Sequence, residues 1–111
     1  MSVNKVILLG YVGNDPEIRY PEKEKPIAFF SLATNETMGN GIEKTEWHKL
    51  VAFGDSANII ERYVKKGTKL YVEGKLSTRE YQDRMKITRK RTEIIVSFFE
   101  ILTQPANSLQ S

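Results

Sequence analysis

Aromatic and basic side chains share one parity along residues 45–53. Trp47, Lys49 and Phe53 are separated by even numbers of residues, and even spacing puts the side chains of an extended strand on one face. Flat rings can stack on nucleobases while a cation pairs with phosphate, so this combination is typical of a surface that binds a nucleic-acid single strand. Aromatic residues on strands also commonly face a core. The residues alone leave both interpretations of Trp47 and Phe53 open.

Positive charge is concentrated in the second half of the chain. Residues 62–91 hold eleven Lys and Arg against three Asp and Glu, whereas the rest of the chain holds six against eleven. This segment could meet a polyanion, although basic runs also simply solvate an exposed hairpin. Tyr81 lies here, with the same parity as two of the basic residues. The cations expected to contact phosphates are Lys5, Lys49, Lys75, Arg79, Arg84 and Lys86.

The sequence offers no constellation for catalysis. A nuclease or phosphoesterase needs converging carboxylates or a cluster of histidines, but His48 is the only His and the candidate acids are scattered over turn and hairpin positions. The absence of Cys excludes disulfides, thiolate zinc sites and Cys nucleophiles. We therefore expect a binding protein, not an enzyme, with no cofactor and no metal.

Five strands are needed to position these residues. Their hydrophobic periodicity and turn residues predict strands over residues 3–13, 27–35, 45–53, 69–81 and 86–102. Residues 17–20 briefly continue the sheet before a charged loop. The last two strands are longer than a small barrel requires, so we expect their hairpin to project as an arm.

A short helix is expected between the third and fourth strands. Asp55 or Ser56 can cap its start, and Gly67 can supply a left-handed stop. Its apolar stripe is formed by Ile60, Tyr63 and Val64. The predicted fold is therefore all-β with one short helix, in the order of a five-stranded OB-fold, a Greek-key barrel that commonly receives oligonucleotides or oligosaccharides. Element order alone does not choose between these ligands, nor does it exclude a protein-interaction module.

A chain of 111 residues suits a single domain. We expect an OB-fold domain over residues 1–103 and a frayed polar segment over residues 104–111. The N-terminus lacks a leader pattern and no run of about 18 apolar residues is present, so we expect a cytoplasmic, nucleoid-associated protein with no membrane partner.

Several collinear motifs resemble the bacterial single-stranded DNA-binding protein family. The clearest are Thr-Glu-Trp-His at residues 45–48 and Val-Ala-Phe-Gly at residues 51–54. Further matches in order and spacing occur at residues 4–8, 13–20, 31–36, 65–67 and 71–76, so that the resemblance covers residues 3–102.

The resemblance implies sequence-independent binding and protection of single-stranded DNA in replication, recombination or repair. It implies that Trp47 and Phe53 stack on bases, and that Tyr81 stands where the family often has a stacking Trp. It also places His48 near a subunit contact in a homotetramer, with a dimer as the alternative. The rival interpretation is an OB-fold adaptor without an acidic tail, similar to primosomal replication adaptors, that acts mainly through protein partners.

The sequence departs from the family pattern at several positions. Met38 lies near a position where many relatives carry Trp, Tyr11 replaces a common Asn and Ser77 replaces a common Arg, so binding could be weaker or have a shorter footprint. Relatives end in an acidic tip, whereas no acidic residue follows Glu100 here. Either this is a tailless variant or the chain is a trimmed binding core. Partners that depend on the tip are not expected.

Overall fold

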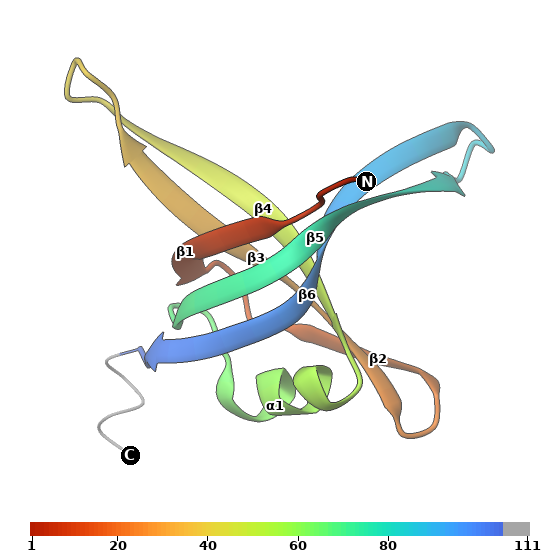
Figure 1. The fold of residues 1–111 in the computed structure, drawn as a ribbon. Coiled ribbons are helices and arrows are strands. Elements are labelled where there is room, and N and C mark those ends of the chain that lie inside the picture. The colour runs from red at the N-terminus through yellow and green to blue at the C-terminus, as the bar shows by residue number, and fades with distance from the viewer. Residues whose placement is uncertain (106–111) are drawn as a thin grey trace.

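The computed structural model describes residues 1–105 of the chain, which form six strands and one helix (Figure 1). The elements are β1 (Val6–Val12), β2 (Glu17–Glu22), β3 (Lys25–Thr37), β4 (Glu43–Phe53), α1 (Asp55–Tyr63), β5 (Lys69–Gln82) and β6 (Thr88–Thr103).

Five of these strands close into a barrel. The sheet order is β1-β5-β6-β4-β3-β2, and an additional pairing of β1 with β3 at Tyr11 and Val12 closes the ring. Only the β4–β6 pairing is parallel among the described strands. β2 lies outside the ring, as a short strand paired with β3. The predicted five-stranded OB-fold barrel, with its helix between the third and fourth strands of the ring, is confirmed.

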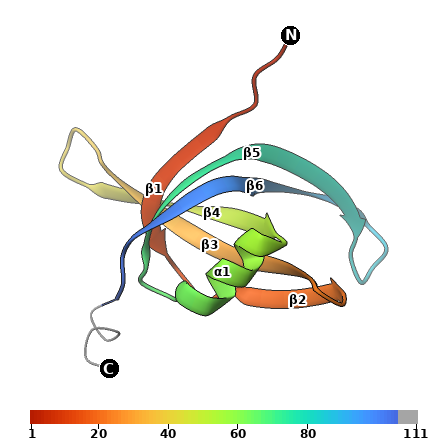
Figure 2. The same cartoon turned by 60° about the horizontal axis from the view of Figure 1, so that its bottom comes forward.

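Aliphatic side chains fill the barrel, and α1 closes one end of it (Figure 2). The largest fully buried apolar side chains come from four different elements: Leu32, Leu50, Ile60, Leu70 and Val72. Strand alternation explains this core, because Leu50 and Ala52 of β4 point inward while Trp47, Lys49 and Phe53 remain exposed.

The expected details of the helix are partly wrong. α1 begins directly after Gly54, whose φ of 61° turns the chain out of β4, and no side chain caps its start. Tyr63 is half exposed, while Ala57 joins Ile60 and Val64 on the buried face. Gly67 does have a positive φ of 93°, but it belongs to the turn after the helix, where the Thr68 N–H donates to the Lys65 carbonyl over 3.0 Å. The tight exit from β4 thus replaces a side-chain cap.

Two long hairpins extend beyond the barrel, β3–β4 and β5–β6 (Figure 1). The predicted arm is the β5–β6 hairpin, and its turn is held by Asp83. One carboxylate oxygen of Asp83 accepts hydrogen bonds from the backbone N–H groups of Met85 and Ile87 over 2.9 and 3.0 Å, and the other pairs with Arg89 Nε at 3.0 Å. The backbone bond from Ile87 and the Arg89 guanidinium lower the pKa of Asp83.

β6 ends at Thr103. Gln104 and Pro105 are half-buried. The remainder of the expected frayed segment, residues 106–111, lies outside the described residues.

Candidate nucleic-acid interface

Alternating residues of β3 and β4 form one outer face of the barrel. The register pairs Phe53 with Ile27 at one end and Trp47 with Ala33 at the other. Trp47 is 61% exposed and Phe53 is 49% exposed. The core interpretation of these two rings is therefore wrong. Six residues of strand separate them, which corresponds to about 20 Å.

A cleft of about 390 Å³ lies between this face and the β5–β6 hairpin. It is lined by Glu17, Arg19, Ile27, Phe29, Val51, Phe53, Ser77, Arg79, Arg91, Glu93 and Ile95. A smaller hollow of about 210 Å³ adjoins it and reaches Lys49, Ser31 and Asn14. The two hollows share four lining residues, and we call them together the groove. Phe53 lies at one end of the groove and Lys49 toward the other.

Trp47 follows Lys49 along the same face of β4, and its position depends on Gly13. A Cβ atom on Gly13 would lie 2.2 Å from Cζ3 of the indole, far inside van der Waals contact. The ring therefore rests on the bare backbone of residue 13. The Ser31 hydroxyl lies close to the same point. Gly13 thus fixes where the exposed indole can lie, a role that the sequence alone does not reveal.

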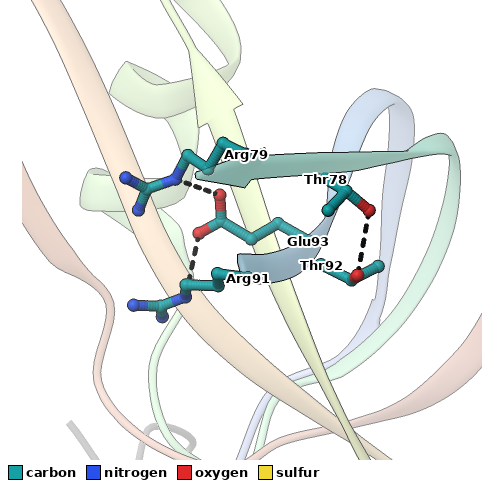
Figure 3. A network of polar contacts seen from close by, with 5 residues as sticks. All are labelled: Thr78, Arg79, Arg91, Thr92 and Glu93. Atoms are coloured by element: carbon teal, nitrogen blue, oxygen red, sulfur yellow. Dashed lines mark hydrogen bonds and ion pairs between the residues drawn. The ribbon is translucent and has the colours of Figure 1, made fainter. Parts of the chain in front are cut away.

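The opposite wall of the groove is basic and contains one buried carboxylate (Figure 3). Arg79 lies across from Arg91 in the β5–β6 register, and both pair with Glu93. Arg79 Nε donates to Glu93 Oε1 over 2.9 Å, and Arg91 Nε lies 3.3 Å from Oε2. The Glu93 side chain is only 7% exposed. The hydrogen bond to Glu93 raises the pKa of Arg79.

Sequence reasoning missed a second ring in the groove, Phe29. Arg19 lies over it, with the guanidinium carbon 5.3 Å from the ring centroid, and also pairs with Glu17 at 3.0 Å. The apolar run at the start of β3 hides the distinction between its two faces. The β3–β4 register resolves it, because Phe29 lies opposite Val51 on the Trp47 face. Arg91 and Glu93 were likewise missed, because a basic segment does not show which of its residues face one another.

The remaining expected phosphate ligands lie outside the groove. Lys5 precedes β1 and pairs with Glu73 at 3.5 Å. Lys75 is exposed on β5, and Arg84 and Lys86 lie in the exposed turn of the β5–β6 hairpin. The structure thus brings together Lys49 and Arg79, but not the other four.

The other two residues singled out from the sequence also lie outside the groove. Tyr81 is 42% exposed and lies opposite Arg89, farther along the β5–β6 hairpin than Arg79. His48 lies on the face of β4 opposite Trp47, half-buried, with Nε2 2.9 Å from the Thr34 hydroxyl. The structure therefore brings Phe53, Lys49 and Arg79 to the groove. Trp47 shares the outer face of β4 with Lys49 and Phe53 but lines neither hollow, and Tyr81 and His48 lie apart.

Residues 1–105 contain no group of three or more His, Cys, Asp or Glu side chains placed to hold a metal ion. Within the same residues, no helix has the length and apolar character to cross a membrane. The residues that line the groove offer ring stacking, charge pairing and hydrogen bonding.

Comparisons with known proteins match nearly the whole chain. The model of the single-strand binding protein family matches residues 3–102. A single-stranded DNA-binding protein of Bacteroides thetaiotaomicron is 48% identical over 109 residues, covering 93% of this chain and 68% of that protein. The protein of the same name from Rhizobium meliloti is 49% identical over 104 residues, covering 88% and 60%. That of Rickettsia prowazekii is 45% identical over 119 residues, covering 99% and 78%.

A solved structure is similar in fold as well as in sequence. A chain of the Plasmodium falciparum SSB complex with ssDNA superposes with a TM-score of 0.83 at 34% identity, covering 93% of this chain and 97% of that one. The chain spans between 60% and 78% of the length of the three bacterial relatives.

Proposed function

The chain belongs to the single-strand binding protein family, and we propose on this premise that it binds and protects single-stranded DNA without sequence preference in replication, recombination or repair. The observation that carries the proposal is the groove. One wall presents the rings of Phe29 and Phe53, and the other presents the guanidinium groups of Arg79 and Arg91. The role requires binding only, with no catalytic step, and a location on the nucleoid follows from it.

Stacking would supply most of the affinity. Trp47 and Phe53 present exposed rings on either side of Lys49, so bases can stack while a phosphate passes the ammonium group. Base stacking on an aromatic side chain contributes roughly 1–3 kcal/mol per base, and every base has a suitable face. Tyr81 would extend the track onto the β5–β6 hairpin.

Phosphates would meet the basic wall and the hairpin beyond it. We propose contacts from Lys49 and Arg79 in the groove, and from Lys75, Arg84 and Lys86 along the hairpin. Lys5 would contribute less, because Glu73 already compensates part of its charge. Each neutralised phosphate releases counterions, so affinity should fall as salt rises.

We also propose a homotetramer, with a dimer as the alternative. β1 pairs with β5 along its length, but the described residues pair its other edge with β3 only at Tyr11 and Val12. A free strand edge is a template for pairing with a second copy. The outer face of β1, β5 and β6 also exposes Ile7, Leu9 and Phe98. His48 would lie near such a contact. Sedimentation of the chain and of Ile7→Glu tests the assembly, with dissociation expected for the variant.

The function is tested by titrating equal-length single- and double-stranded oligonucleotides at two salt concentrations. We expect much tighter binding of the single strand, with a log-log slope against salt of about −0.7 for each phosphate contacted. Equal affinity for the duplex, or a flat slope, would contradict the proposal. Poor affinity for oligonucleotides, combined with a protein partner that survives nuclease treatment, would favour the adaptor alternative.

A further inference from the structure

A carboxylate is out of place in a groove proposed to hold a polyanion, yet Glu93 lies in its wall. It is the one buried charged side chain among residues 1–105. A phosphate passing nearby would be repelled by an uncompensated carboxylate. Burying a charge is also costly unless the charge is paired. Both considerations require that the charge of Glu93 be compensated, and its two arginine neighbours provide that compensation.

Glu93 contacts both arginines through their Nε atoms. Its two oxygens face Arg79 Nε and Arg91 Nε at 2.9 and 3.3 Å, and neither contact uses a terminal nitrogen of the guanidinium groups. Figure 3 shows the outer ends of both guanidinium groups on the same side, directed away from Glu93. The arginine side chains are 52% and 39% exposed, so these outer ends are accessible.

The backbone around Glu93, Arg79 and Arg91, which we call the triad, is also fixed. Arg79 and Arg91 occupy opposite positions in the β5–β6 register. On the other face of the same two strands, the hydroxyls of Thr78 and Thr92 are hydrogen-bonded over 3.0 Å (Figure 3). The triad carries two positive charges and one negative charge, and its positive ends point outward. Ordering the arginines beforehand lowers the entropy lost when they bind a ligand.

We propose that Arg79 and Arg91 form a two-arginine site for a phosphodiester of the bound strand, and that Glu93 is its positioning residue. The proposal rests on the proposed function, because it assumes that the groove receives a nucleic-acid strand. Phe53 lines the same hollow as both arginines, so a base stacked on that ring places its phosphate beside them.

The proposal predicts a change in affinity opposite in sign to the change expected from net charge. Glu93→Gln removes a negative charge, which by long-range electrostatics alone should strengthen binding of a polyanion. If Glu93 positions the arginines, the variant binds more weakly instead. Glu80→Gln is the matched control, because it makes the same change on the same hairpin. Glu80 lies opposite Lys90, one residue away from Arg79 and therefore on the other face of the strand.

The experiment measures the anisotropy of a labelled oligo-dT at several salt concentrations. We expect Glu80→Gln to bind as tightly as the original chain or more tightly. We expect Glu93→Gln to bind several-fold more weakly, with a salt slope reduced by about one because two phosphate contacts weaken. If Glu93→Gln behaves like Glu80→Gln, the proposal is overturned while the proposed function stands. If the original chain itself fails to bind oligo-dT, both fail.

A double-lysine background separates positioning from a general effect on folding. Arg79→Lys with Arg91→Lys keeps both charges but removes both Nε atoms. In that background, adding Glu93→Gln should no longer weaken binding. An equal loss of affinity in both backgrounds would show that Glu93 acts through the fold, which would overturn its positioning role. If thermal melting shows that Glu93→Gln does not fold, the double-lysine variant decides alone: several-fold weaker binding at unchanged net charge supports the site, and unchanged affinity overturns it.

Discussion

The two long hairpins of this barrel contribute opposite properties to one groove. Residues 34–47 of the β3–β4 hairpin contain one Lys and three Glu, whereas residues 75–93 of the β5–β6 hairpin contain seven Lys and Arg against three acidic residues. β4 provides Trp47 and Phe53, and the β5–β6 hairpin provides Arg79 and Arg91. Most of the proposed stacking therefore falls on β4 and most of the proposed phosphate contact on the β5–β6 hairpin, with Tyr81 and Lys49 as the exceptions, so the two contributions can be separated by experiment.

The hairpins also differ in how their functional groups are held. In the β5–β6 hairpin, acidic side chains pair with basic ones: Asp83 accepts hydrogen bonds from the turn and from Arg89, and Glu93 pairs with Arg79 and Arg91. In the β3–β4 hairpin, the indole of Trp47 rests on the backbone of Gly13, which comes from outside the hairpin. Ion pairs thus hold the charged groups of the β5–β6 hairpin, whereas the indole of Trp47 is held where residue 13 has no side chain.

Removing both rings should have the largest effect. The double variant Trp47→Ala/Phe53→Ala loses two stacking platforms, so affinity for oligo-dT should fall by roughly 2–6 kcal/mol if the two contributions add. The salt slope should stay unchanged, because no cation is removed. Tyr63→Ala, which truncates a comparably exposed ring on α1, should bind normally. A changed slope in the ring variant would break the proposed separation.

Removing positive charge from the β5–β6 hairpin should change how steeply affinity depends on salt. Changing Lys75, Arg84 and Lys86 to Gln removes three proposed phosphate contacts, so the log-log slope against salt should become shallower by about two. The control changes Lys23, Lys65 and Lys66 to Gln, three cations outside both hairpins, and alters net charge equally. If the two triple variants have the same slope, general electrostatic attraction and not the hairpin governs binding.

A subtler change tests how Trp47 is held. Gly13→Ala places a methyl group where the indole lies, so the ring must move. We expect altered Trp emission in the free protein and an affinity loss smaller than the roughly 1–3 kcal/mol of a whole stack. Gly39→Ala is the control, since a Cβ there meets nothing within 4 Å. Identical emission from both variants would show that Gly13 does not position the ring.

Strict alternation made one half of the groove predictable from sequence. In β4, Trp47, Lys49 and Phe53 have one parity and Leu50 and Ala52 have the other, so the face carrying Trp47, Lys49 and Phe53 could be assigned without coordinates. The start of β3 is apolar at nearly every position, so Phe29 could not be assigned to the same face. The helix cap was mispredicted because Gly54 turns the backbone directly into α1.

Contacts across strands were beyond the sequence. The pairing of Arg79 and Arg91 through Glu93 depends on the β5–β6 register, which periodicity does not fix. The contact of Gly13 with Trp47 joins residues far apart in the chain and requires the closed barrel. The sequence therefore indicates which kinds of residues are candidates for binding, while the structure shows how they are held.

The most direct test of the account is the emission of Trp47, the only Trp in the chain, during titration with oligo-dT. An exposed indole that stacks on a base should be quenched as binding proceeds, in parallel with the anisotropy of a labelled oligonucleotide. Raising the salt should shift both curves together. If anisotropy reports binding while the emission of Trp47 stays unchanged, the bases do not stack on this ring and the proposed stacking face on β4 is wrong.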